Sequence, residues 1–415
     1  MAKLYAKVHS MGVLQGAWRK VRENGLNSIS EDTYRQVTVF DENPIRNLRA
    51  IQDQLHQCRF SFSSQTGVKI KRGKKKPRPL VIAPIKNRLV QRAVLDVLQG
   101  QVPAVKKVLD TRTSIGGIPG RGTRHGIALV QRAIEAGDRY YVRSDIEAFF
   151  TKIPRQNVIN FVAEHVDDPQ FVDLFRRATE TELHNIDQLG EHRNLFPIGE
   201  HGVAQGSPLS PLMGNIVLRD FDKDMNGRDI TCVRYIDDFI LLGPSLKAVR
   251  KAFAKASVLL ANLGMDAYDP AENRDKAAMG DVTGGIDFLG CQIHPGLVQP
   301  SVAARAKLLA EVEKVLAEGC RAMVVAAKAT SGPAPKQRYA QTLVRVDRVV
   351  RGWGHAFSFC NGRQPFDTLD RRIDQRIAEF RHVAHALARN KGPTVTRRVM
   401  GVHLLSDTPT MPLPT

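Results

Sequence analysis

Apolar residues recur at helical spacing near the start of the chain. Leu14, Trp18 and Val21 fall on one helical face, and the apolar positions from Ile45 to Leu55 follow Pro44 with the same period. We therefore predict that residues 1 to 62 are mainly helical. Further helices are predicted at 88–98, 125–136, 155–182 and 246–263, and through most of the chain after residue 300.

Other segments have the pattern of strands. The run VKIKRGKKKPRPLVIAP, which ends at Pro84, predicts a hairpin with a basic tip. RYYVRSDIEAFF (139–150) is a β-prone run that ends in acidic residues, and CVRYIDDFILLG (232–243) predicts a hairpin with two aspartates at its turn. Short strands are also expected near 265–269 and 286–293, and loops at 113–123, at the start of 202–218 and at 331–335.

Composition narrows the class of protein. The 415 residues are 42% hydrophobic, which favours a folded protein of two or three subdomains over a disordered chain or a small binding module. The formal net charge is +19. An excess of cations of this size favours nucleic acid as the partner; an anionic membrane is a weaker alternative, and a generally basic protein is the plain one.

The cysteines and the N-terminal residues indicate the cellular compartment in which the protein is expected. None of the five cysteines forms a Cys-x-x-Cys pair, which is against a zinc ribbon or a disulfide framework. The chain starts without an apolar leader, and no stretch is long enough to cross a bilayer. We expect a cytoplasmic protein with no membrane partner.

Carboxylates carry the chemistry. Asp237 and Asp238 are adjacent at the tip of an apolar hairpin, which is unfavourable unless a cation neutralises them; a solvated turn is the alternative. Asp145 ends another apolar strand, where a capped strand end is the alternative for Asp145 and Glu147. If the two segments pair, three carboxylates meet, and two Mg²⁺ ions held there can activate a 3′-hydroxyl and stabilise the leaving pyrophosphate.

Many segments, in order, resemble a bacterial reverse transcriptase of the group II intron type. SDIEAFF resembles the first catalytic motif, GVAQGSPLSPLMGNI the nucleotide-cradling motif and YIDD the catalytic hairpin. The other similar segments are GAWRKVRENG (16–25, N-terminal extension), PRPLVIAPIKNRLVQRAV (77–94, fingers), SIGGIPGRG (114–122), LGMDAYDPAENRDK (263–276), FLGCQI (288–293), and RGWGHAFSFCN with FDTLDRRIDQRI (351–361 and 366–377, thumb).

The resemblance implies a fold. We expect an α+β protein of the right-hand polymerase type, with fingers, a palm built on an antiparallel sheet, and a helical thumb. The corresponding division is 1–66 for an N-terminal helical extension, 67–138 for the fingers, 139–298 for the palm with inserted helices, and 299–415 for the thumb.

The resemblance also implies roles for single residues around the metals. Asp145 and Asp237 match the principal ligands of two Mg²⁺ ions, Asp238 the third carboxylate, and the backbone carbonyl of Ile146 would complete the coordination. Lys276 matches a lysine proposed to protonate pyrophosphate, although Ala277 follows it where the family usually has threonine.

Nucleotide and primer contacts follow in the same way. Phe150 matches a steric gate that excludes a 2′-hydroxyl and so selects dNTPs; a core phenylalanine, or an exchange of roles with Phe149, is the alternative. The expected nucleotide-binding residues are Lys71, Arg78, Phe150, Gln205 and Gly206, and the expected primer or template contacts are Phe288, Leu289, Gly290, Arg348 and Arg351. For the run Lys74–Lys76 a solvated loop weighs as much as a specific contact, and Trp18 and Trp353 are predicted to be packing residues.

The implied function is an RNA-directed DNA polymerase that uses dNTPs to copy an associated non-coding RNA into cDNA. The expected partners are that RNA template and the RNA/DNA hybrid, with a homo-oligomer left open. A stand-alone enzyme of this kind resembles the defence-associated reverse transcriptases, which act against phage. The alternatives are a retron or intron-maturase-type reverse transcriptase, template-independent or protein-primed DNA synthesis, and an RNA-binding scaffold.

Overall fold

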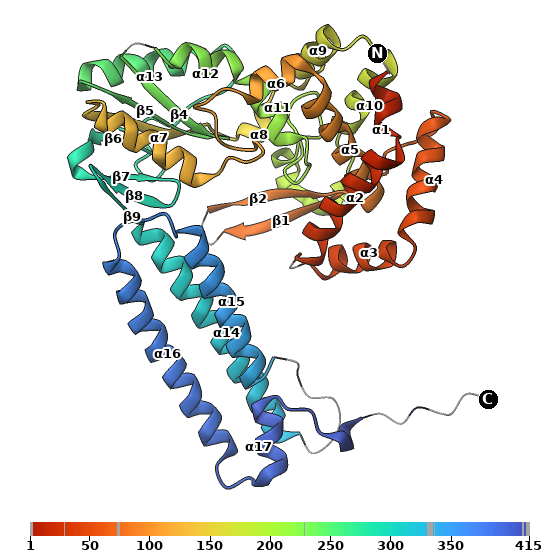
Figure 1. Ribbon diagram of the computed structural model, residues 1–415, viewed down its shortest axis with the longest axis vertical. Helices are drawn as coiled ribbons and strands as arrows, with labels where there is room; N and C mark the ends of the chain where they lie inside the picture. The colour runs from red at the N-terminus through yellow and green to blue at the C-terminus, as the bar shows by residue number, and fades with distance from the viewer. Residues whose placement is uncertain are drawn as a thin grey trace. The chain divides into compact units, whose positions relative to one another are not determined.

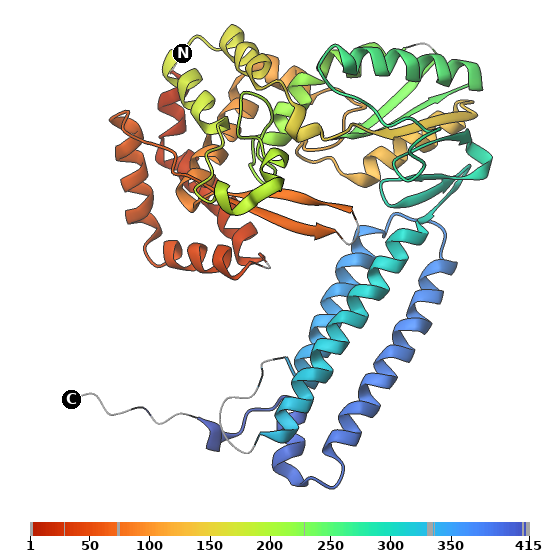
Figure 2. The same ribbon diagram turned by 180° about the vertical axis from the view of Figure 1, so that it is seen from behind.

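The computed structural model describes residues 3–28, 30–72, 75–227, 229–329, 335, 337–408 and 411 (Figures 1 and 2). The chain forms two compact units, Met1–Asp281 and Val282–Thr415. No helix among these residues is both long and apolar enough to cross a membrane. The finer division into extension, fingers, palm and thumb stays a prediction.

Four helices open the first unit: α1 (Leu4–Val8), α2 (Met11–Leu26), α3 (Glu31–Asp41) and α4 (Pro44–His56). Ser30 caps α3 through its side chain, and Pro44 starts α4, where a missing N–H is harmless. The Trp18 ring of α2 lies 4.3 Å from that of Phe40, centroid to centroid, and is buried. The predicted packing role of Trp18 is confirmed.

The basic hairpin follows as predicted. Strands β1 (Thr66–Arg72) and β2 (Lys75–Ile82) pair antiparallel and form a sheet of two strands. Pro79, which has no N–H to give to a sheet, is tolerated because no further strand adds to β2. The side chains of the run Lys74–Lys76 lie outside the described part of the structure.

The main sheet of the first unit has the strand order β4-β5-β3-β6, and all its pairs are antiparallel. Its strands are β3 (Tyr140–Asp145), β4 (Thr231–Tyr235), β5 (Asp238–Gly243) and β6 (Ala277–Asp281). Apolar side chains of β5, such as Phe239 and Leu241, share a core with Ala256 and Leu260 of α13 (Leu246–Ala261). Figures 1 and 2 show α13 and α7 (Thr123–Glu135) on opposite sides of this sheet.

The other helices of the first unit connect the hairpin and the sheet. They are α5 (Ile85–Gln101), α6 (Pro103–Leu109), α8 (Phe149–Lys152), α9 (Arg155–His165), α10 (Pro169–Thr179), η1 (Ile186–Leu195), α11 (Ser210–Val217) and α12 (Arg219–Met225). The helices predicted within 155–182 are α9 and α10, which are separate because Asp168 caps a new helix that begins at Pro169.

The second unit joins a small sheet to long helices. After η2 (Val282–Gly284), the strands β7 (Ile286–Phe288), β8 (Cys291–His294) and β9 (Leu297–Pro300) pair antiparallel in that order. The helices are α14 (Val302–Lys328), α15 (Tyr339–Ala356), α16 (Gln364–Ala388), α17 (Gly392–Met400) and η3 (Leu405–Asp407). Trp353 packs against Phe357 and Phe366, with ring centroids 4.7 and 5.6 Å away, so its predicted packing role is also confirmed.

One strand prediction was wrong, and two strands, β6 and β9, were missed. Residues 265–269 make only an isolated bridge, between Ala267 and Ile146. The edge of the main sheet is instead β6, whose sequence AAMGD lacks β-branched and large aromatic residues. This strand forms because β3 presents an open edge to it, a non-local cause that the local pattern does not contain.

Candidate active site

The three predicted carboxylates meet at one end of the main sheet. Asp145 is the last residue of β3 and lies directly opposite Asp238, the first residue of β5. Asp238 in turn lies opposite Tyr235 of β4. The side chains of Asp145, Asp238 and Tyr235 therefore form a row on one face of the sheet. Asp237 is in the turn beside them, and its carbonyl accepts the amide of Ile146 at 2.9 Å. The strand pairing that the sequence required is therefore present.

The turn that carries Asp237 is strained. Tyr235 and Asp238 pair across a two-residue loop, and its first residue, Ile236, has a φ of 61°. Positive φ at this position alone matches a type II′ turn, where glycine is the usual residue. A β-branched residue there is a conformational outlier that costs on the order of 1–3 kcal/mol. The surrounding structure must hold it.

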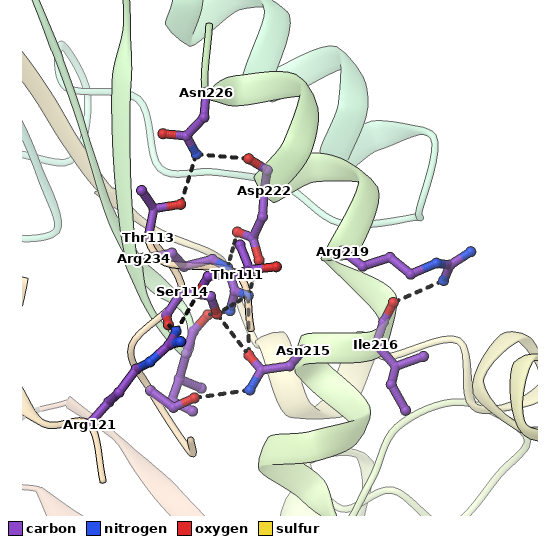
Figure 3. A network of polar contacts seen from close by, with 12 residues as sticks. Thr111, Thr113, Ser114, Arg121, Asn215, Ile216, Arg219, Asp222, Asn226 and Arg234 are labelled. Atoms are coloured by element: carbon purple, nitrogen blue, oxygen red, sulfur yellow. Dashed lines mark hydrogen bonds and ion pairs between the residues drawn. The ribbon is translucent and has the colours of Figure 1, made fainter. Parts of the chain in front are cut away.

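Arg234, the residue before Tyr235 on β4, is fully buried, and its side chain stabilises the turn that carries Asp237 (Figure 3). Its guanidinium makes a two-pronged ion pair with Asp222 of α12, at 2.6 and 2.5 Å. It also donates to the hydroxyl of Ser114 at 2.8 Å and to the amide oxygen of Asn215 at 3.1 Å. Its Nη1 donates to the carbonyl of Ile236 at 2.8 Å. Burial alone would lower the pKa of Arg234, but Asp222 raises it, so the charge is kept.

A glycine-rich loop supports the other side of the turn. The amide of Arg234 donates to Thr113, and the amide of Ile115 donates to Arg234, so this loop runs parallel to β4. A β-carbon added to Gly116 would lie 2.5 Å from the amide nitrogen of Ile236. Asn215 fixes the same glycine by donating to its carbonyl at 3.0 Å. Only a glycine lets the loop approach the turn this closely.

The carboxylates face an unfavourable environment without a cation. Burial, reinforced by the charge of Asp145, raises the pKa of Asp238 to about 8. Burial and Asp145 also raise the pKa of Asp237, against the opposing charges of Lys276 and Arg78. One oxygen of Asp238, Oδ1, is buried and has no hydrogen-bond partner.

Lys276 lies at the same place. Its ammonium group forms an ion pair with Oδ2 of Asp145 and sits 5.6 Å from the ring centroid of Tyr268. Burial lowers the pKa of Lys276, but the hydrogen bond that Lys276 donates to Asp145 and the negative charge of Asp145 together raise it above its ordinary value. Lys276 therefore neutralises part of the acidic charge, and the structure brings this predicted residue to the carboxylates.

The donor set fits a hard divalent cation. Mg²⁺ prefers carboxylate and carbonyl oxygens as ligands. Oδ1 of Asp238 is such an oxygen, and it has no hydrogen-bond partner that would compete with a metal ion. Within the described residues, no three acidic, histidine or cysteine side chains already surround a metal-sized position. Asp145 is turned toward Lys276 instead.

Two predicted nucleotide-binding residues are in contact. Nε of Arg78 on β2 donates to the side-chain oxygen of Gln205 at 2.8 Å, and the amide of Val81 donates to the Gln205 carbonyl at 2.8 Å. Gly206 follows with a φ of 119°, and a β-carbon there would lie 2.6 Å from the carbonyl oxygen of Val81. The motif that begins at Gly202 is thus joined to the basic hairpin. Lys71 lies on β1, exposed.

The two neighbouring phenylalanines have different surroundings. Ala148, with a φ of 48°, turns the chain after β3 and starts α8. Phe149 is 2% exposed and packs against Gly214, where an added β-carbon would meet its ring at 2.8 Å. Phe150 is only partly buried. Of the pair, Phe149 is the core residue.

The remaining predicted residues belong to the second unit. Leu289 and Gly290 form the two-residue turn between β7 and β8, both with positive φ, and Phe288 beside them is buried. Arg348 and Arg351 are exposed on α15, and Arg351 pairs with Asp347 at 2.9 Å.

Comparison with known families identifies the class. Residues 69–293, more than half of the chain, match the reverse transcriptase (RNA-dependent DNA polymerase) family. The chain belongs to this family: it is an RNA-directed DNA polymerase with the right-hand polymerase fold, as the sequence predicted.

Its relatives include bacterial proteins of the group II intron and retron types. It is 25% identical to protein YkfC of Escherichia coli (strain K12) over 282 residues, which are 59% of this chain and 70% of that protein. It is 26% identical to the group II intron-encoded protein LtrA of Lactococcus lactis subsp. cremoris over 37% of this chain and 24% of LtrA. It is 27% identical to the retron Mx65 reverse transcriptase of Myxococcus xanthus over 46% of this chain and 42% of that protein.

Among solved structures, a telomerase from Candida albicans bound to a fragment of telomeric RNA is 11% identical, with a TM-score of 0.44; the match covers 83% of this chain and 60% of that chain. A partial Cas6-RT-Cas1–Cas2 complex is 21% identical, with a TM-score of 0.36 and 62% and 42% of the two chains covered. The chain therefore spans well under two thirds of several of these proteins.

The sequence analysis did not identify the buried residues that support the Ile236–Asp237 turn. Arg234 is a charge inside an otherwise apolar strand, which is a signal that a buried partner exists. Arg143 of β3 lies one row from the carboxylates, on the same face, and its charge opposes part of the rise in the pKa of Asp238 that burial and Asp145 cause. The partner Asp222 carries no such signal, because its helix sequence RDFDKDM offers several equivalent acids.

Proposed function

We propose that this reverse transcriptase extends a DNA end by two-metal nucleotidyl transfer. The observation that carries the proposal is the cross-strand pair of Asp145 and Asp238, next to Asp237, with a buried Asp238 oxygen that lacks a partner. These three carboxylates and the Ile146 carbonyl would hold two Mg²⁺ ions. When bound, Mg²⁺ lowers the pKa of an attacking 3′-hydroxyl and stabilises the charge on the leaving pyrophosphate.

The chain's own residues would bind and select the nucleotide. Arg78 is proposed to bind the triphosphate of a dNTP, and its hydrogen bond to Gln205 orients the guanidinium fork for phosphate oxygens. Gly206 allows close approach of the sugar and base, and Lys71 adds a charge on β1. The partly buried Phe150 would lie under the sugar and exclude a 2′-hydroxyl.

Lys276 would supply a proton to the leaving pyrophosphate. Its raised pKa keeps the ammonium protonated at neutral pH, and its ion pair with Asp145 supports this role. In the second unit, we propose that Phe288, Leu289 and Gly290 contact the primer end. The exposed Arg348 and Arg351 would contact the backbone of the RNA/DNA hybrid.

We infer that the template is a non-coding RNA copied in the cytoplasm, and that the cDNA serves in defence against phage. The net charge of +19 supports a nucleic-acid template, and the resemblance to defence-associated reverse transcriptases supports the role in defence. The match to the Mx65 retron enzyme favours a retron-type reverse transcriptase as the second candidate. Sequencing the RNA and DNA that co-purify with the protein separates the two, and phage plating with an inactive variant tests the defence role.

Primer extension tests the active site directly. Purified protein should extend a primer on RNA in Mg²⁺ and dNTPs, and Asp237→Ala with Asp238→Ala should abolish extension while RNA binding survives. The matched control is Asp220→Ala with Asp224→Ala, which removes two exposed carboxylates of α12 and should leave extension intact. Extension by the first double variant would show that the site is assigned wrongly.

A further inference from the structure

Strand β6 lies at an edge of the main sheet, and within the first unit only β3 pairs with it. The opposite edge is covered by a loop, because Arg234 of β4 exchanges backbone hydrogen bonds with Thr113 and Ile115. In the described part of the first unit, no bridge or backbone hydrogen bond from another segment reaches the outer side of residues 278–280. An uncovered edge of this kind can accept a further strand.

The backbone of Met279 faces the open side of β6. The amide of Ile146 donates to Asp237, on the β5 side of β3. Backbone groups of an antiparallel strand alternate in direction, so those of Arg143, three residues earlier, point toward β6. The residue opposite Arg143 is Ala278, and Met279 next to it therefore turns its N–H and C=O away from β3. An added strand would pair with these two groups.

A pocket of about 570 Å³ opens beside β6. Met279, which lines it, lies opposite Val142 of β3, and Val142 lies opposite Leu241 of β5. These side chains are on the face of the sheet that packs against α13. Asp145 is an odd number of residues from Val142, so its carboxylate is on the other face. The pocket and the catalytic carboxylates thus lie on opposite faces of the sheet.

The lining of this pocket combines apolar and cationic side chains. Phe253 of α13 and Met279 supply apolar surface, and Met279 is 38% exposed. Arg250 of α13 and Arg274 of the loop before β6 are exposed cations. Asp269 is the single acid among the described lining residues, and its Oδ1 already accepts a backbone amide at 2.7 Å. The cations therefore outnumber the acid beside the open edge.

This charge distinguishes between possible occupants of the edge. A second copy of the chain would bring the same arginines together, on molecules that each carry a net charge of +19. A nucleic acid would suit the arginines, but it has no strand backbone to pair with Met279. An extended peptide with acidic side chains satisfies both features, because its backbone pairs with the edge and its carboxylates complement Arg250 and Arg274.

We propose that the outer edge of β6 is a docking surface for an extended acidic segment of a partner protein. The segment adds to the four-stranded sheet next to β6. Its alternate side chains point into the pocket, where carboxylates bind Arg250 and Arg274 and the methylene stems lie on Phe253 and Met279. The inference does not rest on the proposed function, because neither the catalytic carboxylates nor a template takes part in it.

The test uses the full chain and, as the probe, a capped hexapeptide of alternating glutamate and valine. Hydrogen–deuterium exchange is followed at residues 277–281, so that non-specific binding to a basic protein is not counted. At saturation the peptide should slow exchange of the Met279 amide by at least about fivefold. Arg250→Glu with Arg274→Glu should raise the Kd by about tenfold. A hexapeptide of alternating lysine and valine should show the reverse preference and protect only this double variant.

Matched variants separate the backbone contact from the side-chain contacts. Met279→Pro removes an outward N–H at an edge position, where proline is tolerated, and should abolish peptide protection of β6. Met279→Ala keeps the N–H and should raise the Kd by no more than about threefold. Lys251→Glu reverses an exposed charge of α13 outside the pocket and should leave binding unchanged. Circular dichroism confirms folding of each variant, and the arginine pair decides the question if Met279→Pro does not fold.

Three outcomes would overturn the proposal. The first is that the glutamate peptide fails to protect residues 277–281, or protects them equally in the charge-reversed variant. The second is protection by a short RNA oligonucleotide in place of the peptide, which would make the edge a nucleic-acid surface. The third is protection that grows with protein concentration alone, which would make the edge an interface between copies of the chain.

Discussion

The guanidinium of Arg234 donates to the carbonyl oxygen of Ile236 at 2.8 Å, which ties a fully buried charge to the apex of the catalytic turn. Ile236 is held there in a left-handed conformation that isoleucine normally avoids. The same arginine binds Asp222, Ser114 and Asn215. The direction of the turn is therefore set by residues that lie behind the site and do not touch a substrate.

Arg234→Met should show that the arginine has two effects. It leaves Asp222 buried without its partner, so we expect a loss of about 3–5 kcal/mol in the free energy of unfolding. Adding Asp222→Leu removes the orphaned charge and should restore most of that stability. The double variant should nevertheless extend primers poorly, because the Ile236 carbonyl still lacks its donor. Denaturant unfolding and primer extension measure the two effects separately, and full activity in the double variant would refute the positioning role.

Gly116→Ala should displace the catalytic turn, because the added carbon would lie 2.5 Å from the Ile236 amide nitrogen. We expect kcat for nucleotide addition to fall by at least about tenfold, with about 1–3 kcal/mol lost from the free energy of unfolding. Gly122→Ala is the matched control, since its added carbon meets no atom within 4 Å. Equal activity in the two variants would show that the close approach at Gly116 has no function.

Asp238→Asn should stabilise the protein in metal-free buffer while abolishing activity. The folded pKa of Asp238 is about 8, above its ordinary value of 3.8, so the unfolded chain releases this proton first as pH rises. Its contribution to stability is therefore complete below pH 3.8 and lost as pH rises through about 8. Within that window the free energy of unfolding should fall by about 1.4 kcal/mol per pH unit from this group.

Melting temperatures across this window, with a chelator present, check the prediction. The difference between the unaltered protein and Asp238→Asn should grow with pH, and added Mg²⁺ should reverse it. A pH-independent difference would contradict the assigned environment of Asp238.

Phe150→Ala and Phe149→Ala should fail in different ways. Phe149 packs against Gly214 in the core, so its truncation should cost about 3–5 kcal/mol of stability. Phe150 is only partly buried, so Phe150→Ala should stay folded and admit ribonucleotides. The ratio of kcat/KM for dNTPs over rNTPs measures the change; unchanged discrimination in Phe150→Ala would place the gate elsewhere.

The sequence predicted the parts of the site that lie on strong local patterns. Asp145 and the Tyr235–Asp238 turn lie at the ends of apolar strands. A carboxylate in that position can be recognised as unusual from the sequence alone. Arg78 and Gln205 were predicted separately, from the family resemblance, yet their hydrogen bond joins segments 127 residues apart. No local pattern contains a contact of that kind.

Other features depend on packing that one sequence does not reveal. Strand β6 exists because β3 leaves an edge open, although AAMGD is a poor strand sequence. The choice of Asp222 as partner of Arg234 is set by the packing of α12 against β4. Phe149 and Phe150 have different environments because Ala148, in the left-handed conformation, sets the direction in which α8 starts. The sequence shows only two adjacent phenylalanines and does not indicate which of them enters the core.

Gly116 and Gly117 are consecutive, and they face different neighbours: Gly116 abuts Ile236, and Gly117 abuts Pro211 of α11. Neither position can take a larger residue without displacing the neighbour that it abuts. The two glycines together therefore set how closely the catalytic turn and the start of α11 can approach the same loop.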